Sequence, residues 1–139
     1  MAASMRIQMV QTGPVQFVAT NATGATISID GPPDMGGQNA GLRPMETLLA
    51  ALASCSAVDV VHIMKKQREE LQGLEVEVTG ERADTIPAVF TRIHLRFTGR
   101  GPIDPAKLQR AVALSMETYC SVTRMLQPTV TITAEGVVG

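Results

Sequence analysis

Aromatic residues are scarce in this sequence: its 139 residues include three Phe, one Tyr and no Trp. Proteins that bind single-stranded nucleic acid stack the bases on exposed aromatic rings, and this composition offers no such platform. The formal net charge is −1, with charges of both signs interspersed along the chain. That balance argues against nucleic acid and against anionic membranes as partners. The core must therefore be built from Val, Leu, Ile, Ala and the eight Met residues.

Features of an exported protein are also missing. The first residues, MAASMRIQMVQTG, have neither an apolar core of signal-peptide length nor a transit-peptide composition. We therefore expect a cytoplasmic protein, in which thiols stay reduced unless they perform redox chemistry. The two cysteines, Cys55 and Cys120, then need an explanation other than a structural disulfide. They have no CxxC or HxxxH pattern beside them, so we expect no metal site.

The most apolar segment, residues 44–71, predicts one long helix. Gly and Pro are absent from it after Pro44, which suits a first helical turn. Its apolar residues fall on nearly every face, as in a helix that is buried or spans a membrane. The longest uncharged run, residues 47–58, is too short for a span of about 20 residues, so we predict a buried core helix. Covering such a helix on two sides is demanding for one small chain, and we expect a homodimer.

The rest of the chain predicts strands, a second helix and one long loop around this core helix. Asp104 and Pro105 have the residue types of an N-cap and a first helical position. We expect an α+β fold in a single domain, residues 1–139. Its predicted elements are N-terminal strands over residues 5–29, a functional or mobile loop over 30–43, a hairpin over 74–97, the second helix over 105–119 and a last strand over 129–135.

Cys55 lies near the middle of the long helix. A free Cys in such a place usually packs as a small hydrophobe, and a chemical role is the sharper alternative. Asp59 lies one turn further along the same stripe, but a carboxylate beside a thiol raises the thiol pKa. His62 is roughly 10 Å along the helix from Cys55, which is too far for a direct Cys–His nucleophile pair.

Cys120 is expected at the C-terminal end of the second helix. We expect this thiol to be more accessible than one in mid-helix. Arg124, about one turn further on if the helix continues, would lower the pKa of the thiol. One thiol in the core helix and one at a helix end are consistent with a reactive and resolving pair. The spacing alone does not show whether the two meet.

Two motifs resemble those of a known family. Residues 43–60, RPMETLLAALASCSAVDV, resemble the central-helix signature of the OsmC/Ohr family. Residues 117–122, ETYCSV, resemble that family's second cysteine motif, at a matching distance from the first. The order of elements is similar over residues 5–137. The resemblance implies an OsmC-like fold: a long buried central helix wrapped by antiparallel sheets, in an intertwined homodimer.

The resemblance also implies a chemistry for the cysteines. It implies a peroxiredoxin-like reduction of peroxides, especially organic hydroperoxides, in oxidative-stress defence. On that analogy Cys55 is the peroxidatic thiolate, which is oxidised to a sulfenic acid. Cys120 then resolves it as a disulfide. An external dithiol reductant restores both thiols, and no bound cofactor takes part.

The sequence departs from the peroxidase pattern in two places. Peroxidase members carry an Arg in the N-terminal strand–turn region that pairs with the reactive thiolate, and residues 19–24 here contain none. They also place Glu directly after the helix-starting Pro, whereas Glu46 stands one residue later. Arg43 or Arg6, from this chain or from a partner, is the candidate substitute for the missing cation.

The possible supporting residues around the two cysteines are therefore Glu46, Arg43, Asp59 and Arg124. A second hypothesis follows from the missing cation. In it the chain is a non-catalytic OsmC-fold dimer that binds a small apolar ligand in a Met-lined pocket. The cysteine pair favours the enzyme, and the absent Arg favours the binding protein.

Overall fold

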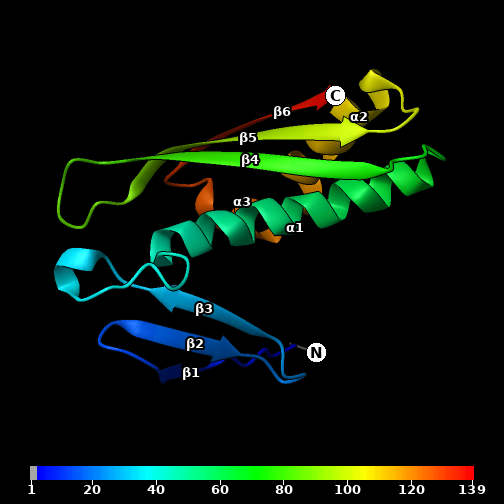
Figure 1. The fold of residues 1–139 in the computed structure, drawn as a ribbon. Helices are drawn as coiled ribbons and strands as arrows, with labels where there is room; N and C mark the ends of the chain where they lie inside the picture. The colour runs from blue at the N-terminus through cyan, green and yellow to red at the C-terminus, as the bar shows by residue number, and fades with distance from the viewer. Residues whose placement is uncertain (1–2) are drawn as a thin grey trace. The chain divides into compact units, whose positions relative to one another are not determined.

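The computed structural model describes residues 3–139. Helices and strands together make an α+β fold, as predicted (Figure 1). The chain forms two compact units: the first ends at Leu48, and the second is Leu49–Gly139.

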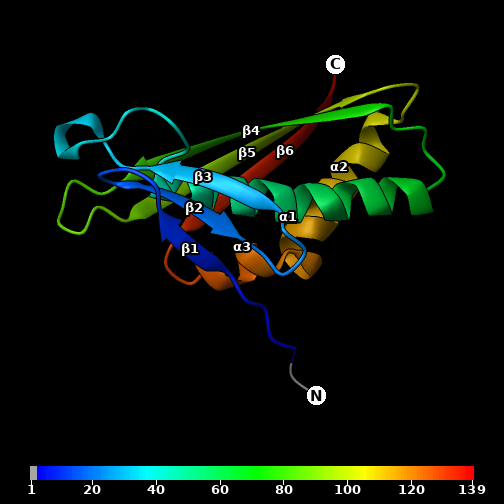
Figure 2. The ribbon, with the colours of Figure 1, turned by 60° about the horizontal axis from the view of Figure 1, so that its bottom comes forward.

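The first unit is built around an antiparallel sheet. Its strands β1 (Gln8–Gln11), β2 (Gln16–Thr20) and β3 (Thr26–Asp30) pair in chain order, and Figure 2 shows them side by side. The turn between β2 and β3 is closed by Asn21, whose side-chain oxygen accepts from the backbone N–H groups of Thr23 and Ala25. Such Asx turns suit a tight reversal between strands.

The loop after β3 is held by Asp30, a residue that the sequence did not single out. The Asp30 carboxylate is buried, and its Oδ2 accepts from the backbone N–H of Gln38 at 2.9 Å and of Ala40 at 3.2 Å. The Gln38 hydrogen bond is the largest cause that lowers the Asp30 pKa, while burial opposes it. A short 3-10 turn, η1 (Pro33–Met35), lies within the loop. The carboxylate therefore fixes the path of a segment with little regular structure of its own.

The second unit contains a mixed sheet. Strands β4 (Gly73–Arg82) and β5 (Phe90–Arg100) are antiparallel, whereas β6 (Thr131–Val138) runs parallel to β5. The prediction of antiparallel sheets was wrong for β6. The helical segment between β5 and β6 makes a crossover, and a crossover brings the next strand back in the same direction. On the β4–β5 pair, acidic and basic side chains face each other, and Arg92 Nε lies 3.5 Å from Glu81 Oε2.

Three helices lie against one face of this sheet (Figures 1 and 2): α1 (Pro44–Lys66), α2 (Pro105–Leu114) and α3 (Ser121–Leu126). A π-helical turn, η2 (Ser115–Tyr119), connects α2 to α3. The fully buried core side chains come from α1, β5 and α2: Leu52, Val60, Met64, Ile93, Leu95, Phe97, Leu108 and Ala111.

Within one chain the central helix is buried along a single stripe, and the prediction that a second copy covers its other side stays a prediction. Leu52, Ser56, Val60 and Met64, spaced four residues apart, are buried, whereas Val58 is 69% exposed. Within one chain the sheet covers only one side of the helix. By length and composition α1 could also cross a membrane, a criterion that core helices of soluble proteins meet as well.

The helix also ends earlier than predicted, at Lys66 instead of residue 71. Arg68 adopts the left-handed conformation, with φ 60°, and the backbone N–H of Glu69 donates to the carbonyl of Met64. This closure resembles a Schellman motif, in which a left-handed residue stops a helix. Arg is not a usual residue for that position, so little in the residue types indicated that the helix would stop there.

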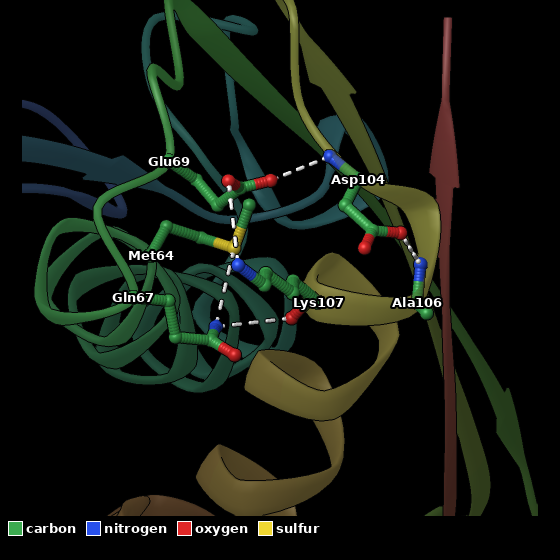
Figure 3. A network of polar contacts seen from close by, with 6 residues as sticks. All are labelled: Met64, Gln67, Glu69, Asp104, Ala106 and Lys107. Atoms are coloured by element: carbon green, nitrogen blue, oxygen red, sulfur yellow. Dashed lines mark hydrogen bonds and ion pairs between the residues drawn. The ribbon is translucent and has the colours of Figure 1, made fainter.

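Polar contacts tie the end of α1 to the start of α2 (Figure 3). Asp104 caps α2 as predicted, because its carboxylate accepts from the N–H of Ala106 at 2.9 Å. The N–H of Asp104 itself donates to Glu69 at 2.6 Å. Gln67 donates to the carbonyl of Lys107 at 3.2 Å. These contacts set where α2 begins, and therefore where η2 and Cys120 lie relative to the second half of α1.

Candidate functional site

The two cysteines meet inside the second unit. Cys55 projects from α1 and is half-buried, while Cys120 lies between η2 and α3 and is only 3% exposed. Cys55 lies near enough to Cys120 for its side chain and charge to help raise the pKa of the Cys120 thiol. Both thiols are free. The structure therefore brings the two cysteines near each other, and their roles as a reactive and resolving pair stay a prediction.

The prediction that Cys120 is the more accessible thiol was wrong. Cys120 closes the π turn, because its backbone N–H donates to the carbonyl of Ser115 at 2.8 Å. It is also the N-cap of α3, where its sulfur accepts from the N–H of Thr123 at 3.4 Å. The chain changes direction at this residue, and the thiol turns inward.

Burial raises the pKa of the Cys120 thiol, and the neighbouring Cys55 raises it further. The side chain and backbone of Thr123 lower it, but by less. The prediction that Arg124 depresses this pKa was wrong: Arg124 is exposed in the last turn of α3, and the pKa is raised. At neutral pH Cys120 is therefore a protonated thiol.

Ser115 connects the π turn to the central helix. Its hydroxyl oxygen lies 3.0 Å from Asp59 Oδ2 and 3.2 Å from the carbonyl oxygen of Ser56, the residue after Cys55. Ser115 and Ser56 are both buried. The sequence analysis did not single out Ser115, although a small polar residue among the buried apolar side chains Leu108, Ala111 and Val112 was an available signal.

Two of the predicted supporting residues, Arg43 and Glu46, have partners within the first unit. The Glu46 carboxylate accepts from the backbone N–H of Arg43 at 2.8 Å, which caps the start of α1. The Arg43 guanidinium donates to Asn39 at 3.3 Å. Its charge also contributes to lowering the pKa of Asp30. Arg6, the other candidate cation, donates to Gln8 at 3.3 Å. A role for these side chains at Cys55 stays a prediction.

A cavity of about 370 Å³ lies between α1 and η2. Its lining includes Asp59, one turn beyond Cys55, and Tyr119, which precedes Cys120. Two basic side chains and two aliphatic ones complete it: His62, Lys66, Ile63 and Leu114. Among residues 3–139, no group of three His, Cys, Asp or Glu side chains is arranged to hold a metal ion.

Comparison with known proteins places this geometry in a family. The model for OsmC-like proteins matches residues 36–135. Protein YhfA of Escherichia coli (strain K12) is 43% identical over 122 residues, which cover 84% of this chain and 85% of YhfA. A hypothetical protein from Aquifex aeolicus VF5 has a similar structure, with a TM-score of 0.87 and 30% identity over 99% of this chain and 98% of that one.

The fold also extends to a more distant protein. The organic hydroperoxide resistance protein OhrB of Bacillus subtilis matches with a TM-score of 0.66 and 19% identity, over 96% of this chain and 98% of that one. At this identity the likeness concerns the fold alone.

Proposed function

The chain belongs to the OsmC-like protein family, and we propose that it is a thiol-dependent reductase of organic hydroperoxides that acts in oxidative-stress defence. The observation that carries the proposal is that Cys55 and Cys120 lie near enough for Cys55 to raise the pKa of the Cys120 thiol. The name of the Bacillus subtilis relative, an organic hydroperoxide resistance protein with the same fold, supports the choice of substrate. A disulfide between these residues would be the product of each catalytic cycle.

Cys55 is the peroxidatic residue on this proposal. It is half-buried and within reach of a small substrate, whereas Cys120 is buried and has a raised pKa. The Cys55 thiolate attacks the distal peroxide oxygen. The S–O bond forms as the O–O bond breaks, and the alcohol leaves after taking up a proton. Cys55 is then a sulfenic acid.

Cys120 is the resolving residue. Its sulfur attacks the Cys55 sulfur, the S–S bond forms, and the sulfenic oxygen leaves as water with the Cys120 proton. Because the pKa of Cys120 is raised, this thiol must give up its proton as it attacks, and the proton leaves with the hydroxide as water. An external dithiol then reduces the disulfide by two thiol–disulfide exchanges. No bound cofactor enters this cycle.

The supporting roles follow from the predicted residues. Arg43, from this chain or a partner, is the candidate cation for the Cys55 thiolate, because no Arg stands at residues 19–24. Glu46 would act on Arg43, whose backbone it caps. Asp59 acts through Ser115, to which it is hydrogen-bonded. Arg124 is exposed at the end of α3, where its charge is available to an incoming reductant.

The proposed assembly is an intertwined homodimer in the cytoplasm, without nucleic acid or membrane as a partner. The support is the apolar side of α1, where Val58 is 69% and Val61 49% exposed within one chain. A second copy of the helix would remove this surface from water. A reducing compartment would supply the dithiol that the cycle consumes.

Turnover with a dithiol reductant tests the function. Wild-type protein should consume cumene hydroperoxide catalytically with dithiothreitol, and Cys55→Ser should be inactive. Without a dithiol, Cys120→Ser should consume about one equivalent of peroxide and stop at the Cys55 sulfenic acid, since only the resolving step is missing. Wild-type activity no greater than that of Cys55→Ser would contradict the proposal.

Binding of a small apolar ligand by a non-catalytic dimer is the second candidate. The cavity beside Ile63, Leu114 and Tyr119 favours it. The Met lining predicted from the sequence is wrong for this cavity, since none of its six lining residues is Met. This candidate predicts that a fluorescent apolar probe binds wild-type protein and Cys55→Ser equally, and that hydroperoxide leaves both thiols reduced.

A further inference from the structure

We propose that Ser115 and Asp59 are positioning residues, which hold the Cys120 thiol in place for disulfide formation with Cys55. Their part in peroxide turnover rests on the function proposed above. Their effect on the pairing of the two thiols does not, because any thiol oxidant can test it.

A short path of hydrogen bonds connects the two cysteines through Ser115. The carbonyl of Ser56, next to Cys55 in the chain, lies 3.2 Å from the Ser115 hydroxyl. The carbonyl of Ser115 accepts the backbone N–H of Cys120 at 2.8 Å. The backbone on both sides of the thiol pair is therefore tied to one buried serine.

Asp59 makes this tie stronger. The Ser115 hydroxyl has a single proton, and its oxygen is 3.0 Å from Asp59 Oδ2. A hydrogen bond to a carboxylate is roughly twice as strong as one between neutral groups. Ser115 is fully buried, and without Asp59 its proton would have only the longer, neutral hydrogen bond to the Ser56 carbonyl. Asp59 and Ser56 lie within one turn of α1, and they fix where η2 docks on that helix.

The π turn explains why such a tie is needed. In η2 the Cys120 N–H donates five residues back to Ser115, one residue further than in an α-helix. If this segment relaxed to a regular α-helix, each following residue would be rotated by about 100°. Cys120 would then leave Cys55. Isolated π turns are rare in proteins, and those that occur are often found at functional sites. This agrees with a role of η2 in orienting the Cys120 side chain.

The alternative is that the hydrogen bonds of Ser115 satisfy a buried hydroxyl and have no effect on the two thiols. Two substitutions at Asp59 distinguish this hypothesis from a positioning role. Asp59→Asn keeps an oxygen that can accept the Ser115 proton, whereas Asp59→Leu has a similar size and no acceptor. Ser115→Ala removes the donor. Ser54→Ala is the matched control, because Ser54 adjoins Cys55 but is exposed and donates to the carbonyl of Ala51 in its own helix.

The test is redox equilibration of the purified protein with glutathione. Oxidised glutathione converts the two thiols to the Cys55–Cys120 disulfide and is itself reduced to two glutathione molecules. The equilibrium constant gives the effective concentration of one thiol at the other. We expect Ser115→Ala and Asp59→Leu to lower it about tenfold, which is about 30 mV for a two-electron couple. Asp59→Asn should stay within about threefold of wild type, because its amide oxygen still accepts the Ser115 proton. Ser54→Ala should also stay within about threefold, because Ser54 makes no part of the Ser115 contacts.

The inference would be overturned if wild type, Ser115→Ala and Asp59→Leu had equal equilibrium constants with glutathione. It would also be overturned if Asp59→Asn lowered the constant as much as Asp59→Leu. Circular dichroism identifies a variant that does not fold; if Ser115→Ala is one, the Asp59 pair decides, since Asp59 is only half-buried. Sulfenic acid trapping in Cys120→Ser tests the proposed function separately. If no sulfenic acid forms with hydroperoxide while the glutathione constants shift as expected, the peroxidase fails and the positioning role stands.

Discussion

Cys120, between η2 and α3, lies near enough to Cys55 of α1 for Cys55 to help raise the pKa of its thiol, although the two residues are far apart in the sequence. The pair is unsymmetrical, because Cys55 is half-buried and Cys120 is buried. The proposed cycle rests on this asymmetry, because a peroxide would reach the more exposed sulfur of Cys55 before that of Cys120.

The raised pKa of Cys120 predicts a loss of stability at alkaline pH. Folding favours the protonated thiol, so as the pH rises above about 8.5 the unfolded chain loses this proton first. The free energy of unfolding then falls with pH until the folded-state pKa is passed, by at most about 1.4 kcal/mol per pH unit. Below the unfolded pKa the contribution is complete and independent of pH.

Urea unfolding followed by circular dichroism, in the presence of a reductant, measures this effect. The difference in unfolding free energy between wild type and Cys120→Ala should be constant from pH 6 to pH 8 and should shrink at pH 9.5. Other titrating groups are common to both proteins and cancel. A difference that grows with pH would mean that the site favours the Cys120 thiolate.

The exposed apolar side of α1 predicts a specific effect of charge on assembly. Val58→Glu places a carboxylate where the proposed partner helix packs, and burial of an unpaired charge is costly. We expect wild type to be a dimer by light scattering and Val58→Glu to be largely monomeric at micromolar concentration. Val89→Glu is the matched control, because Val89 is also about half exposed but lies outside the helices. A monomeric wild type would remove the basis for the partner helix.

Asp30 predicts a local change in the first unit. In Asp30→Ala the backbone N–H groups of Gln38 and Ala40 lose their acceptor. Their hydrogen exchange should become roughly tenfold faster, the effect of losing one hydrogen bond. Exchange in β4 and β5 should not change, which serves as the internal control. Unaltered exchange at both amides would show that other contacts hold this loop.

Much of the fold was visible in local sequence signals. Pro44 and the Asp104–Pro105 pair mark the starts of α1 and α2 because their chemistry acts within one turn. The alternation of apolar residues in β4 and β5 reflects a sheet with one covered face. The family resemblance rested on the residues around the two cysteines, which are also the residues that meet.

The features that the sequence did not reveal depend on tertiary contacts. The inward turn of Cys120 comes from a π turn docked on α1 through Ser115, and no local pattern encodes that docking. The apolar content of α1 predicts that its surface is buried, but it does not predict which element buries it. One side of α1 is therefore exposed within a single chain. The early end of the helix depends on a left-handed Arg68, a conformation that its residue type disfavours.

Intact mass spectrometry under non-reducing conditions tests the central claim most directly. After one equivalent of an organic hydroperoxide, wild type should lose two hydrogen atoms as the Cys55–Cys120 disulfide forms. Cys120→Ser should instead gain one oxygen, trapped by dimedone at Cys55, and Cys55→Ser should not change. Dimedone adduct at Cys120 instead of Cys55, or a wild-type mass that stays at the reduced value, would contradict the account.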